Sequence, residues 1–478
     1  MTDSRLIGLL SSFSTKELKQ LKLMVDSPFF NNQEPIKKLM DFLLGFAPQF
    51  DSPKMTYQNA YGFIYGKKSI QSDPQTAVLK VMSKLTGLIK DFVVQLELEE
   101  HPVHWRLLQA KYFEKKQLLE YVPRFLDEAE ALVKEIPYQN EYYFRYKLLL
   151  EFERSSFLNI IQDKSSLDYN LGVQNEALDH YYAMSKLQTY CFAKNEANRT
   201  TFNYDFSQMA AFLDWIKATD LTSVPSIKLW YQALVLLNEP STEHFYHLKN
   251  DIIQHRQYLD PPVMRAMYSY LANTAPIIHL EREIFLKEVF DLYRTQIDLG
   301  ILYINGFLSP VLLRNITIFG LKLREFDWVE QFLQENADKI VPTYAEREDI
   351  VALCKAYLYF GRGDFLKTLD MINTLHCDNI FTKMDERRLR LMCYYEMNIG
   401  DPFDDLVNSF RKFLTDHKKK TPESHITVNR LFIHYIHKIA ASNYLKKDQL
   451  LAIAEEVQQV PVLPEKEWLL AKITERIR

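Results

Sequence analysis

The stretch of sequence that decides the fold is AYLYFGRGDFLKTLDMINTL, residues 356–375. Its first half carries alanine and large apolar residues at helical spacing, and the glycines of residues 361–364 then interrupt this pattern. A second apolar stripe follows, made of Phe365, Leu369, Ile372 and Leu375. Residues that recur every three or four positions share one face of an α-helix, whereas glycine favours turns. The stretch therefore predicts two helices joined by a short turn, with Phe365 buried between them.

The same pattern occurs in two neighbouring stretches. Phe326, Phe365 and Phe403 each open a second apolar stripe, and they recur at intervals of 39 and 38 residues. Two of the three turns contain a glycine, Gly363 or Gly400. A repeat of roughly 20 to 50 residues built from helical pairs is typical of an α-solenoid, in which each pair contacts mainly its neighbours. The sequence therefore predicts an array of helical hairpins in its last third.

Residues 356–375 also resemble a tetratricopeptide (TPR) repeat. Ala356 and Tyr359 match the small and aromatic positions of its first helix, and Leu369 matches an apolar position of the second. The stretch departs from the family at Thr368, where the family has alanine, in lacking the closing proline, and in a period longer than about 34 residues. The resemblance implies TPR-like hairpins and leaves the family's standard peptide groove unassigned.

The first hundred residues predict a separate bundle of four helices. Ser14 and Glu17 have the spacing of a capping box, which satisfies two backbone donors at a helix start. The longest apolar stripe predicts a helix over about residues 75–100, and the residue before Pro102 disfavours its continuation. We expect an all-α protein in which an N-terminal helical bundle precedes an α-solenoid of TPR-like helical hairpins. The predicted domains are an N-terminal helical domain at 1–101, an irregular hairpin array at 102–300 and a TPR-like array at 301–478.

A second resemblance spans most of the chain. The stretches SPFFN (27–31), FIYG (63–66) and EKEWL (465–469) are similar to the opening and the ending of an uncharacterised family of bacterial proteins. The resemblance implies a bacterial, all-helical protein, and it carries over no activity, ligand or site residue.

Composition disfavours several classes of protein. The chain of 478 residues has 58 Lys and Arg against 62 Asp and Glu, so its net charge gives no general attraction to nucleic acid or to an anionic membrane. Its 12 glycines are too few for a typical β-rich or nucleotide-cradling fold. No apolar run approaches the roughly 18 residues that span a bilayer, and residues 1–14 lack the pattern of a secretion signal. The cysteines form no CxxC pair and are too few for a disulfide framework; they are Cys191, Cys354, Cys377 and Cys393. We expect a cytoplasmic protein with no membrane segment.

Chemistry-bearing motifs are scarce. The best metal candidate is a helical stripe of His244, His247, Asp251 and His255. At 1.5 Å per residue the first and third of these are about 10 Å apart, whereas zinc holds its ligands at about 2 Å. No HExxH, GxSxG or ExxH motif occurs, and no nucleophile, base and orienting group stand at a diagnostic spacing. We therefore expect no metal, no cofactor and no enzymatic activity.

The most basic local feature lies near the C-terminus. Four residues share the polar face of a predicted helix that follows the lysine run 418–420, namely Arg430, His434, His437 and Lys438. Such a face is usually solvated, and the functional alternative is contact with an anion or an acidic partner. These four residues are the candidate contact site.

The predicted function follows from the predicted architecture. Helical-hairpin arrays offer extended surfaces and need no reactive groups, so we expect a non-catalytic protein–protein interaction scaffold or adaptor with a protein or peptide partner. The alternative is a nucleic-acid-linked regulator that uses residues 66–90, with the helical array as its sensor. In this segment basic residues outnumber the single Asp73; they are Lys67, Lys68, Lys80, Lys84 and Lys90. A helix-turn-helix joins its helices by about three or four residues, and the break here is about twice as long, which makes nucleic acid the less favoured partner.

Overall fold

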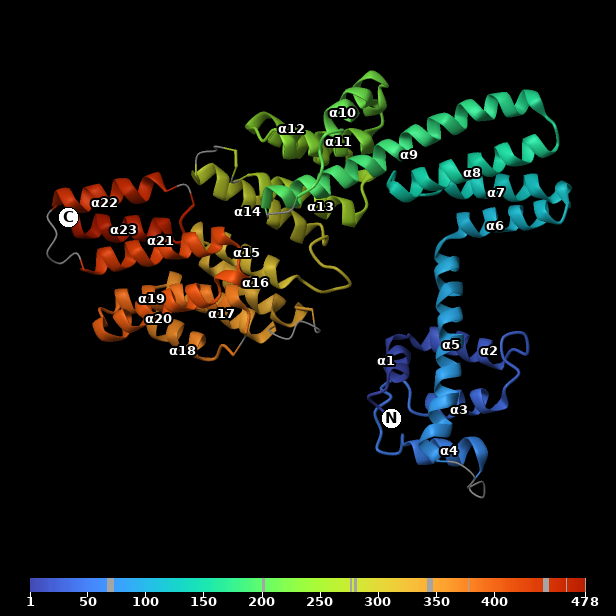
Figure 1. Cartoon of the computed structure of the whole chain (residues 1–478), viewed down its shortest axis with the longest axis horizontal. Helices are drawn as coiled ribbons and strands as arrows, with labels where there is room; N and C mark the ends of the chain where they lie inside the picture. The colour runs from blue at the N-terminus through green and yellow to red at the C-terminus, as the bar shows by residue number, and fades with distance from the viewer. Residues whose placement is uncertain are drawn as a thin grey trace. The chain divides into compact units, whose positions relative to one another are not determined.

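The fold is known from a computed structural model, which describes residues 1–66, 73–199, 203–275, 277–278, 282–341, 347–376, 378–441, 447–460 and 462–477. These residues form helices joined by short connections (Figure 1), and their strand-like pairings are limited to two isolated bridges, Ile304–Phe307 and Leu308–Ile340. The prediction of an all-α protein is confirmed. Within the same residues no helix is both long enough and apolar enough to cross a membrane.

Internal contacts divide the chain into two units, Met1–Ser185 and Lys186–Arg478. The division falls inside one long helix, α9 (Lys164–Arg199). The three domains expected from the sequence, with boundaries after residues 101 and 300, stay a prediction.

The first unit begins with a bundle of helices around α5 (Figure 1); these are α1 (Arg5–Ser12), α2 (Thr15–Asp26), α3 (Glu34–Leu44), α4 (Tyr57–Tyr65) and α5 (Pro74–Glu100). The capping box predicted at the start of α2 is confirmed. The Glu17 amide donates to Ser14 Oγ over 3.3 Å, and the Ser14 amide donates to Glu17 Oε2 over 2.6 Å. The sequence predicted four helices here, and α1 is an additional one of 8 residues.

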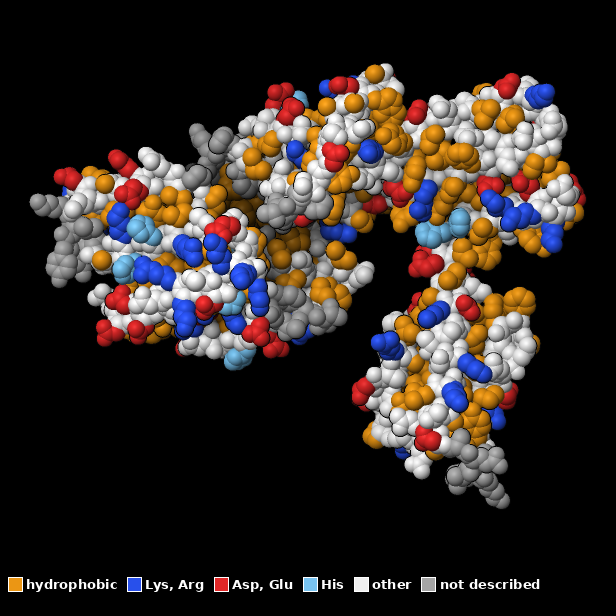
Figure 2. Space-filling model, viewed as in Figure 1, with side chains coloured by type: hydrophobic (Ala, Val, Ile, Leu, Met, Phe, Trp, Pro, Cys, Tyr) orange, Lys and Arg blue, Asp and Glu red, His pale blue; other side chains and the backbone are white. Residues whose placement is uncertain are grey.

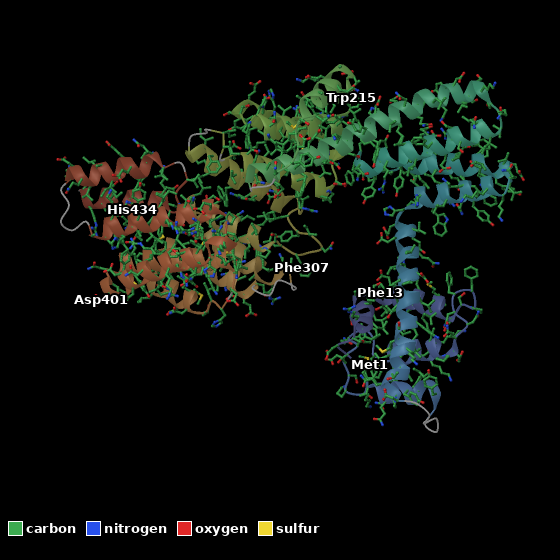
Figure 3. All side chains as sticks on the ribbon, in the orientation of Figure 1. Met1, Phe13, Trp215, Phe307, Asp401 and His434 are labelled. Atoms are coloured by element: carbon green, nitrogen blue, oxygen red, sulfur yellow. The ribbon has the colours of Figure 1, made fainter. Side chains whose placement is uncertain are left out.

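The bundle closes on one hydrophobic core. Leu10, Leu39 and Leu85, from three different helices, are each fully buried in it. Phe13, labelled in Figure 3, packs edge-on against Phe92 with the ring centroids 5.8 Å apart. The apolar face of the short α1 is buried in this core, which stabilises the helix, since a helix of this length is marginal in isolation.

The remainder of the first unit comprises α6 (Pro102–Lys115), α7 (Val122–Lys134), α8 (Glu141–Ile160) and the first part of α9. α6 contacts both α7 and α8, and α7 contacts α8. A second core forms between these helices from residues such as Val103, Leu126 and Leu150.

The second unit contains the last part of α9 and the helices α10 (Met209–Ala218), α11 (Pro225–Asn238), α12 (Thr242–His255), α13 (Pro261–Thr274), α14 (Arg282–Asp298), α15 (Pro310–Lys322), α16 (Phe326–Asn336), α17 (Arg347–Gly361), α18 (Phe365–Asn373), α19 (Ile380–Glu396), α20 (Gly400–Asp416), α21 (Glu423–Ala440), α22 (Lys447–Gln459) and α23 (Lys466–Ile477). α15 contacts α16 and α17, and α17 contacts α18 and α19. Each of these helices therefore packs both on its neighbour in sequence and on the next helix but one. Single 3-10 turns are η1 (Leu119–Tyr121), η2 (Leu221–Ser223), η3 (Arg256–Tyr258), η4 (Ala337–Lys339) and η5 (Lys418–Lys420).

One turn recurs at the ends of α6, α8, α14, α15, α17 and α19. In each, an N–H just past the helix donates to the carbonyl five residues earlier, over 2.9 to 3.1 Å; the donor residues are Leu118, Asp163, Ile301, Glu325, Asp364 and Ile399. The residue before each donor has a positive φ, between 53° and 81°; these residues are Gln117, Gln162, Gly300, Arg324, Gly363 and Asn398. This geometry is the Schellman motif, which satisfies carbonyls at a helix end. The prediction that Gly363 lies in a turn is confirmed. Gly400 instead begins α20, and Asn398 takes the left-handed position of the turn after α19.

The prediction that Phe365 is buried is wrong. Its side chain is half-buried and contacts the ring of Phe360, with the centroids 5.5 Å apart. The side chains of α18 that are buried are Thr368 and Ile372. The structural counterpart of the predicted anchor is Phe403 in α20, which is only 4% exposed. The repeat in sequence therefore marks the first residue of α16 and of α18, whereas in α20 the phenylalanine is the fourth residue of the helix and is buried.

Candidate functional site

The four residues of the predicted contact site all lie on α21. Arg430 and His434 are exposed, and His437 and Lys438 are half-buried. The opposite face of the helix is buried and includes Phe432 and Ile436. His434, labelled in Figure 3, therefore belongs to a solvent-facing stripe, as its spacing predicts.

Two of these four residues have acidic neighbours. Lys438 Nζ lies 2.9 Å from Glu456 Oε2 of α22, and His437 Nε2 lies 3.8 Å from Asp404 Oδ1 of α20. Among the residues that the structure describes, no ion pair involves Arg430 or His434. Figure 2 shows basic and histidine side chains gathered with acidic ones over this part of the second unit. Arg430 therefore offers a partner a positive charge without an acidic neighbour, and the exposed imidazole of His434 lies one turn away on the same face.

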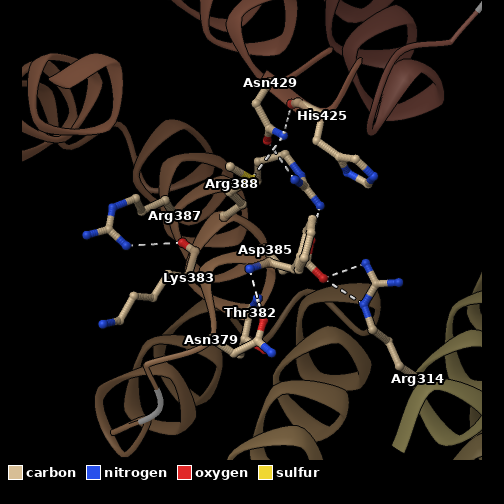
Figure 4. Close-up of polar contacts among 11 residues, drawn as sticks. Arg314, Asn379, Thr382, Lys383, Asp385, Arg387, Arg388, His425 and Asn429 are labelled. Carbon is tan, nitrogen blue, oxygen red and sulfur yellow. Dashed lines mark hydrogen bonds and ion pairs between the residues drawn. The ribbon is translucent and has the colours of Figure 1, made fainter. Parts of the chain in front are cut away.

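A buried polar network lies beneath this surface, around Asp385 of α19 (Figure 4). Arg314 Nε of α15 donates to Asp385 Oδ2 over 2.6 Å, and Arg388 pairs with the other carboxylate oxygen. Arg388 Nη1 also donates to Asn429 Oδ1 of α21 over 2.7 Å, and Asn429 Nδ2 donates to the His425 carbonyl over 2.8 Å. The network therefore joins three helices that are far apart in sequence.

The charges of this network compensate one another. Asp385 and Arg388 are 6% and 7% exposed. Burial raises the pKa of the Asp385 carboxyl, but Arg314 and Arg388 outweigh that effect and hold the pKa below its usual range. A carboxylate held in this way is a poor proton acceptor near neutral pH, so the network serves to position α19 between α15 and α21.

The other side of α19 carries a cationic cavity that the sequence analysis missed. Lys383, Arg387 and Arg390 stand at positions i, i+4 and i+7 of the helix and line a cavity of about 270 Å³ beside the end of α18. Figure 4 shows Lys383 and Arg387 projecting away from the Asp385 network. Glu386 is the one carboxylate among the lining residues, which also include Ile372, Asn373, Leu375 and Thr382. We call this space the α18–α19 cavity.

Each cation of the α18–α19 cavity is held by few partners. Lys383 Nζ lies 2.8 Å from Asp378 Oδ1, whose side chain is fully exposed. Arg390 Nε donates to Glu386 Oε1 over 2.6 Å, and its Nη1 donates to Asn373 Oδ1 over 2.9 Å. One acidic side chain thus has to serve more than one guanidinium group.

Arg387 is the least satisfied of the three. Its Nη1 donates to the Lys383 carbonyl over 3.1 Å and to Glu386 over 3.3 Å, and its guanidinium lies 4.3 Å from the ring centroid of Phe413. Its Nε is buried and has no hydrogen-bond partner. Burial lowers the pKa of Arg387 despite the nearby Glu386. This guanidinium retains an unused donor and an incompletely balanced charge.

A signal for this cavity was present in the sequence as the run ERRLR at residues 386–390. The run has three arginines and one glutamate, which is only a modest excess of positive charge. The cavity could not be recognised from this run, because the fold directs Arg388 to a different side of α19 from Arg387 and Arg390. Arg388 faces Asp385 and Asn429, whereas Arg387 and Arg390 line the α18–α19 cavity.

The histidine stripe considered for metal binding lies on α12. Asp251 Oδ2 is 2.8 Å from Lys228 Nζ, and His255 Nδ1 is 3.1 Å from the Asp251 carbonyl. His244 and His247 line a separate cavity of about 380 Å³. Across the described part of the chain, no group of three or more His, Cys, Asp or Glu side chains is placed to hold a metal ion. Three of the four cysteines are free and buried, and Cys377 lies outside the described residues.

The basic segment of the alternative hypothesis is described in part. α4 ends at Tyr65 and α5 begins at Pro74, and Lys67 and Lys68 lie outside the described residues. Lys80 and Lys84 are exposed one turn apart on α5, and Lys84 Nζ donates to Gln33 Oε1 over 2.6 Å. The spacing between α4 and α5 exceeds that of a helix-turn-helix, and the basic residues of this segment that the structure describes all lie on α5.

We compared the chain with known protein families, curated proteins and solved structures. No protein-family model matches the chain, and no curated protein or solved structure matches it. The residues of α19 and α21 therefore have to be interpreted from their own geometry.

Proposed function

We propose that this protein is a non-catalytic interaction scaffold or adaptor, in which a solenoid of TPR-like helical hairpins presents binding surfaces to a protein or peptide partner. Two features support the solenoid. α15, α17 and α19 pack on one another in succession, and each ends in the same Schellman turn. Arrays of this kind expose long helical faces, because each hairpin needs only its neighbours to bury its core.

The observation that carries the proposal is the exposed polar face of α21, on which Arg430 supplies a positive charge. Arg430 and His434 project from α21, while the same helix is anchored from below through Asn429 to the Asp385 network. A charged side chain on an anchored helix is suited to binding an acidic partner, because the backbone that carries it needs no further ordering on binding. The buried thiols fit a reducing compartment, in agreement with the proposed cytoplasmic location.

The test is affinity capture of the full chain from native cell extract, followed by mass spectrometry and by nucleic-acid and metabolite analysis. The proposal requires a stoichiometric protein partner whose retention falls with added salt and in the double variant Arg430→Ala/His434→Ala. The matched control, Arg411→Ala on the exposed side of α20, should retain the partner. Recovery of a bound metabolite without a protein would instead favour an enzyme or sensor.

A nucleic-acid-linked regulator remains the second candidate, because Lys80 and Lys84 are exposed on α5. It requires co-purified nucleic acid that is lost in Lys80→Gln/Lys84→Gln and retained in Arg430→Ala/His434→Ala. The scaffold proposal requires the opposite pattern, so the same capture experiment separates the two.

A further inference from the structure

The α18–α19 cavity has the composition of a binding site for a small oxyanion. Lys383, Arg387 and Arg390 contribute three positive charges, and Glu386 contributes one negative charge. Because Asp378 is fully exposed, its pairing with Lys383 is a surface ion pair, and such pairs add little stability. A ligand that offers Lys383 a better-placed oxygen would therefore displace Asp378 at little cost.

Arg387 supplies the directional part of the site. Its Nε is a buried donor with no partner, and its flat guanidinium is held over the ring of Phe413. Planar guanidinium groups bind carboxylates and phosphates through two parallel hydrogen bonds, and such charge-assisted bonds are the strong ones. An oxyanion beside Arg387 would accept a hydrogen bond from the unpaired Nε. Its negative charge would also balance the positive charge of the guanidinium, which burial leaves poorly solvated.

The rest of the lining favours a carboxylate on an aliphatic stem. Ile372 and Leu375 provide apolar surface next to the cations, which suits methylene groups. The cavity lies beside the last residue of α18, Asn373, where helix carbonyls give a partial negative charge that disfavours a dianion more than a monoanion. Glu386 and the exposed Asp378 would likewise repel a chain of phosphates.

We propose that the α18–α19 cavity binds the carboxylate of an acidic side chain from a partner polypeptide, with Arg387 and Lys383 as its principal contacts. The inference rests on the proposed scaffold function in taking its ligand from a polypeptide. It goes beyond that function by placing a specific contact on α19, separate from Arg430 and His434 of α21.

The inference is tested by isothermal titration of the full chain with synthetic probes. The probes are a blocked peptide, acetyl-Gly-Glu-Gly-Glu-Gly-amide, the same peptide with glutamine at both acidic positions, inorganic phosphate, and a single-stranded oligothymidylate. The glutamic peptide should bind and the glutamine peptide should not. Lys383→Gln and Arg387→Lys should each weaken binding by about tenfold or more, the usual effect of losing a charge-assisted contact.

Lys412→Gln is the matched control, because it removes the same charge from an exposed position on α20 outside the cavity lining and should leave the affinity within about twofold. Circular dichroism of each variant establishes that it is folded, and Lys383→Gln is the decisive variant since its side chain is half-exposed. Equal binding of the two peptides, tighter binding of phosphate or oligothymidylate, or unchanged affinity in Lys383→Gln would overturn the assignment. A capture experiment that returns no protein partner would overturn the scaffold proposal alone, because the peptide titration uses no extract.

Discussion

Asp385 shows how a single carboxylate organises several helices. It is buried between Arg314 and Arg388, and through Arg388 and Asn429 it reaches α21. Burying charges is costly, so such a group stabilises the fold only while all its partners are present. The network is therefore sensitive to removal of any one member, whereas apolar replacement of a whole buried set is often nearly neutral.

Asp385→Asn should destabilise the second unit by about 3–5 kcal/mol, the usual cost of leaving a buried partner charge uncompensated. Urea unfolding followed by circular dichroism measures this change. The control is Asp378→Asn, which alters a fully exposed carboxylate and should leave the unfolding midpoint nearly unchanged. Similar effects of the two substitutions would contradict the role assigned to Asp385.

The charge of Asp385 also predicts how stability depends on pH. Because the pKa of Asp385 is lowered in the folded protein, its contribution to stability is fully present above the unfolded value near 3.9 and is lost as the pH falls through the folded value. The stability gap between the natural protein and Asp385→Asn should therefore be constant around pH 6–7 and narrow below about pH 4. Unfolding midpoints measured across this range should show that narrowing; a gap that widens in acid would contradict the assigned charge state.

At the scale of the elements, the recurring Schellman turn separates backbone geometry from amino-acid identity. Arg324 and Gly363 occupy equivalent left-handed positions, with φ of 61° and 81°. A side chain in this region costs roughly 1–2 kcal/mol, and glycine avoids that cost. The turns persist at Arg324 and at the corresponding glutamines because packing of the two flanking helices outweighs the local strain.

Exchanging the residues at these two turns tests this account. Arg324→Gly should raise stability by about 0.5 kcal/mol or more, whereas Gly363→Ala should lower it by about 1 kcal/mol. Nothing lies within 4 Å of a Cβ added at Gly363, so the loss of stability in Gly363→Ala would report backbone strain and not a steric clash. Thermal unfolding of both variants gives the direction of each change in stability. A stabilising Gly363→Ala would show that an alanine at this turn is not strained.

The two phenylalanines of the repeat give a second test at this scale. Phe403→Ala should cost about 3–5 kcal/mol, because the ring is buried and its removal leaves a cavity. Phe365→Ala makes the same chemical change at a half-buried position and should cost less than about 2 kcal/mol. Equal losses in urea unfolding would show that the burial of the two rings is the same in solution.

These elements also show what the sequence could predict. Apolar periodicity and the capping box at Ser14 identified helices correctly, because both depend on residues close in sequence. The turns at Gln117 and Arg324 were missed, because glycine was the signal sought and their geometry comes from helix packing. Phe365 was wrongly predicted to be buried, because its hydrophobicity does not tell which side of α18 packs against the neighbouring helices.

At the scale of the whole chain, the solenoid proposal predicts that damage stays local. Phe403→Ala should accelerate hydrogen exchange across roughly residues 310–440 and leave α1 to α5 protected, because a hairpin array transmits stability mainly between neighbours. Exchange measured by mass spectrometry on the full chain gives both regions in one experiment. Equal acceleration in α2 and in α20 would indicate one cooperative core and contradict the array.

The candidate site was predictable only in part. The α21 stripe of Arg430 and His434 could be found because one helix carries it. The α18–α19 cavity depends on residues from two helices and on how the run 386–390 divides between two faces. The pairing of Arg314 with Asp385, residues that lie 71 positions apart, had no local signal at all.

The most direct test of the scaffold proposal is hydrogen exchange of the full chain with and without its captured protein partner. We expect slower exchange in α19 and α21 on binding, with α5 unchanged from Thr76 to Lys90, because the side chains proposed to contact the partner lie on α19 and α21. The protection should disappear when Arg430→Ala/His434→Ala weakens the complex. Protection confined to α5, or no protection anywhere in Lys186–Arg478, would contradict the proposal.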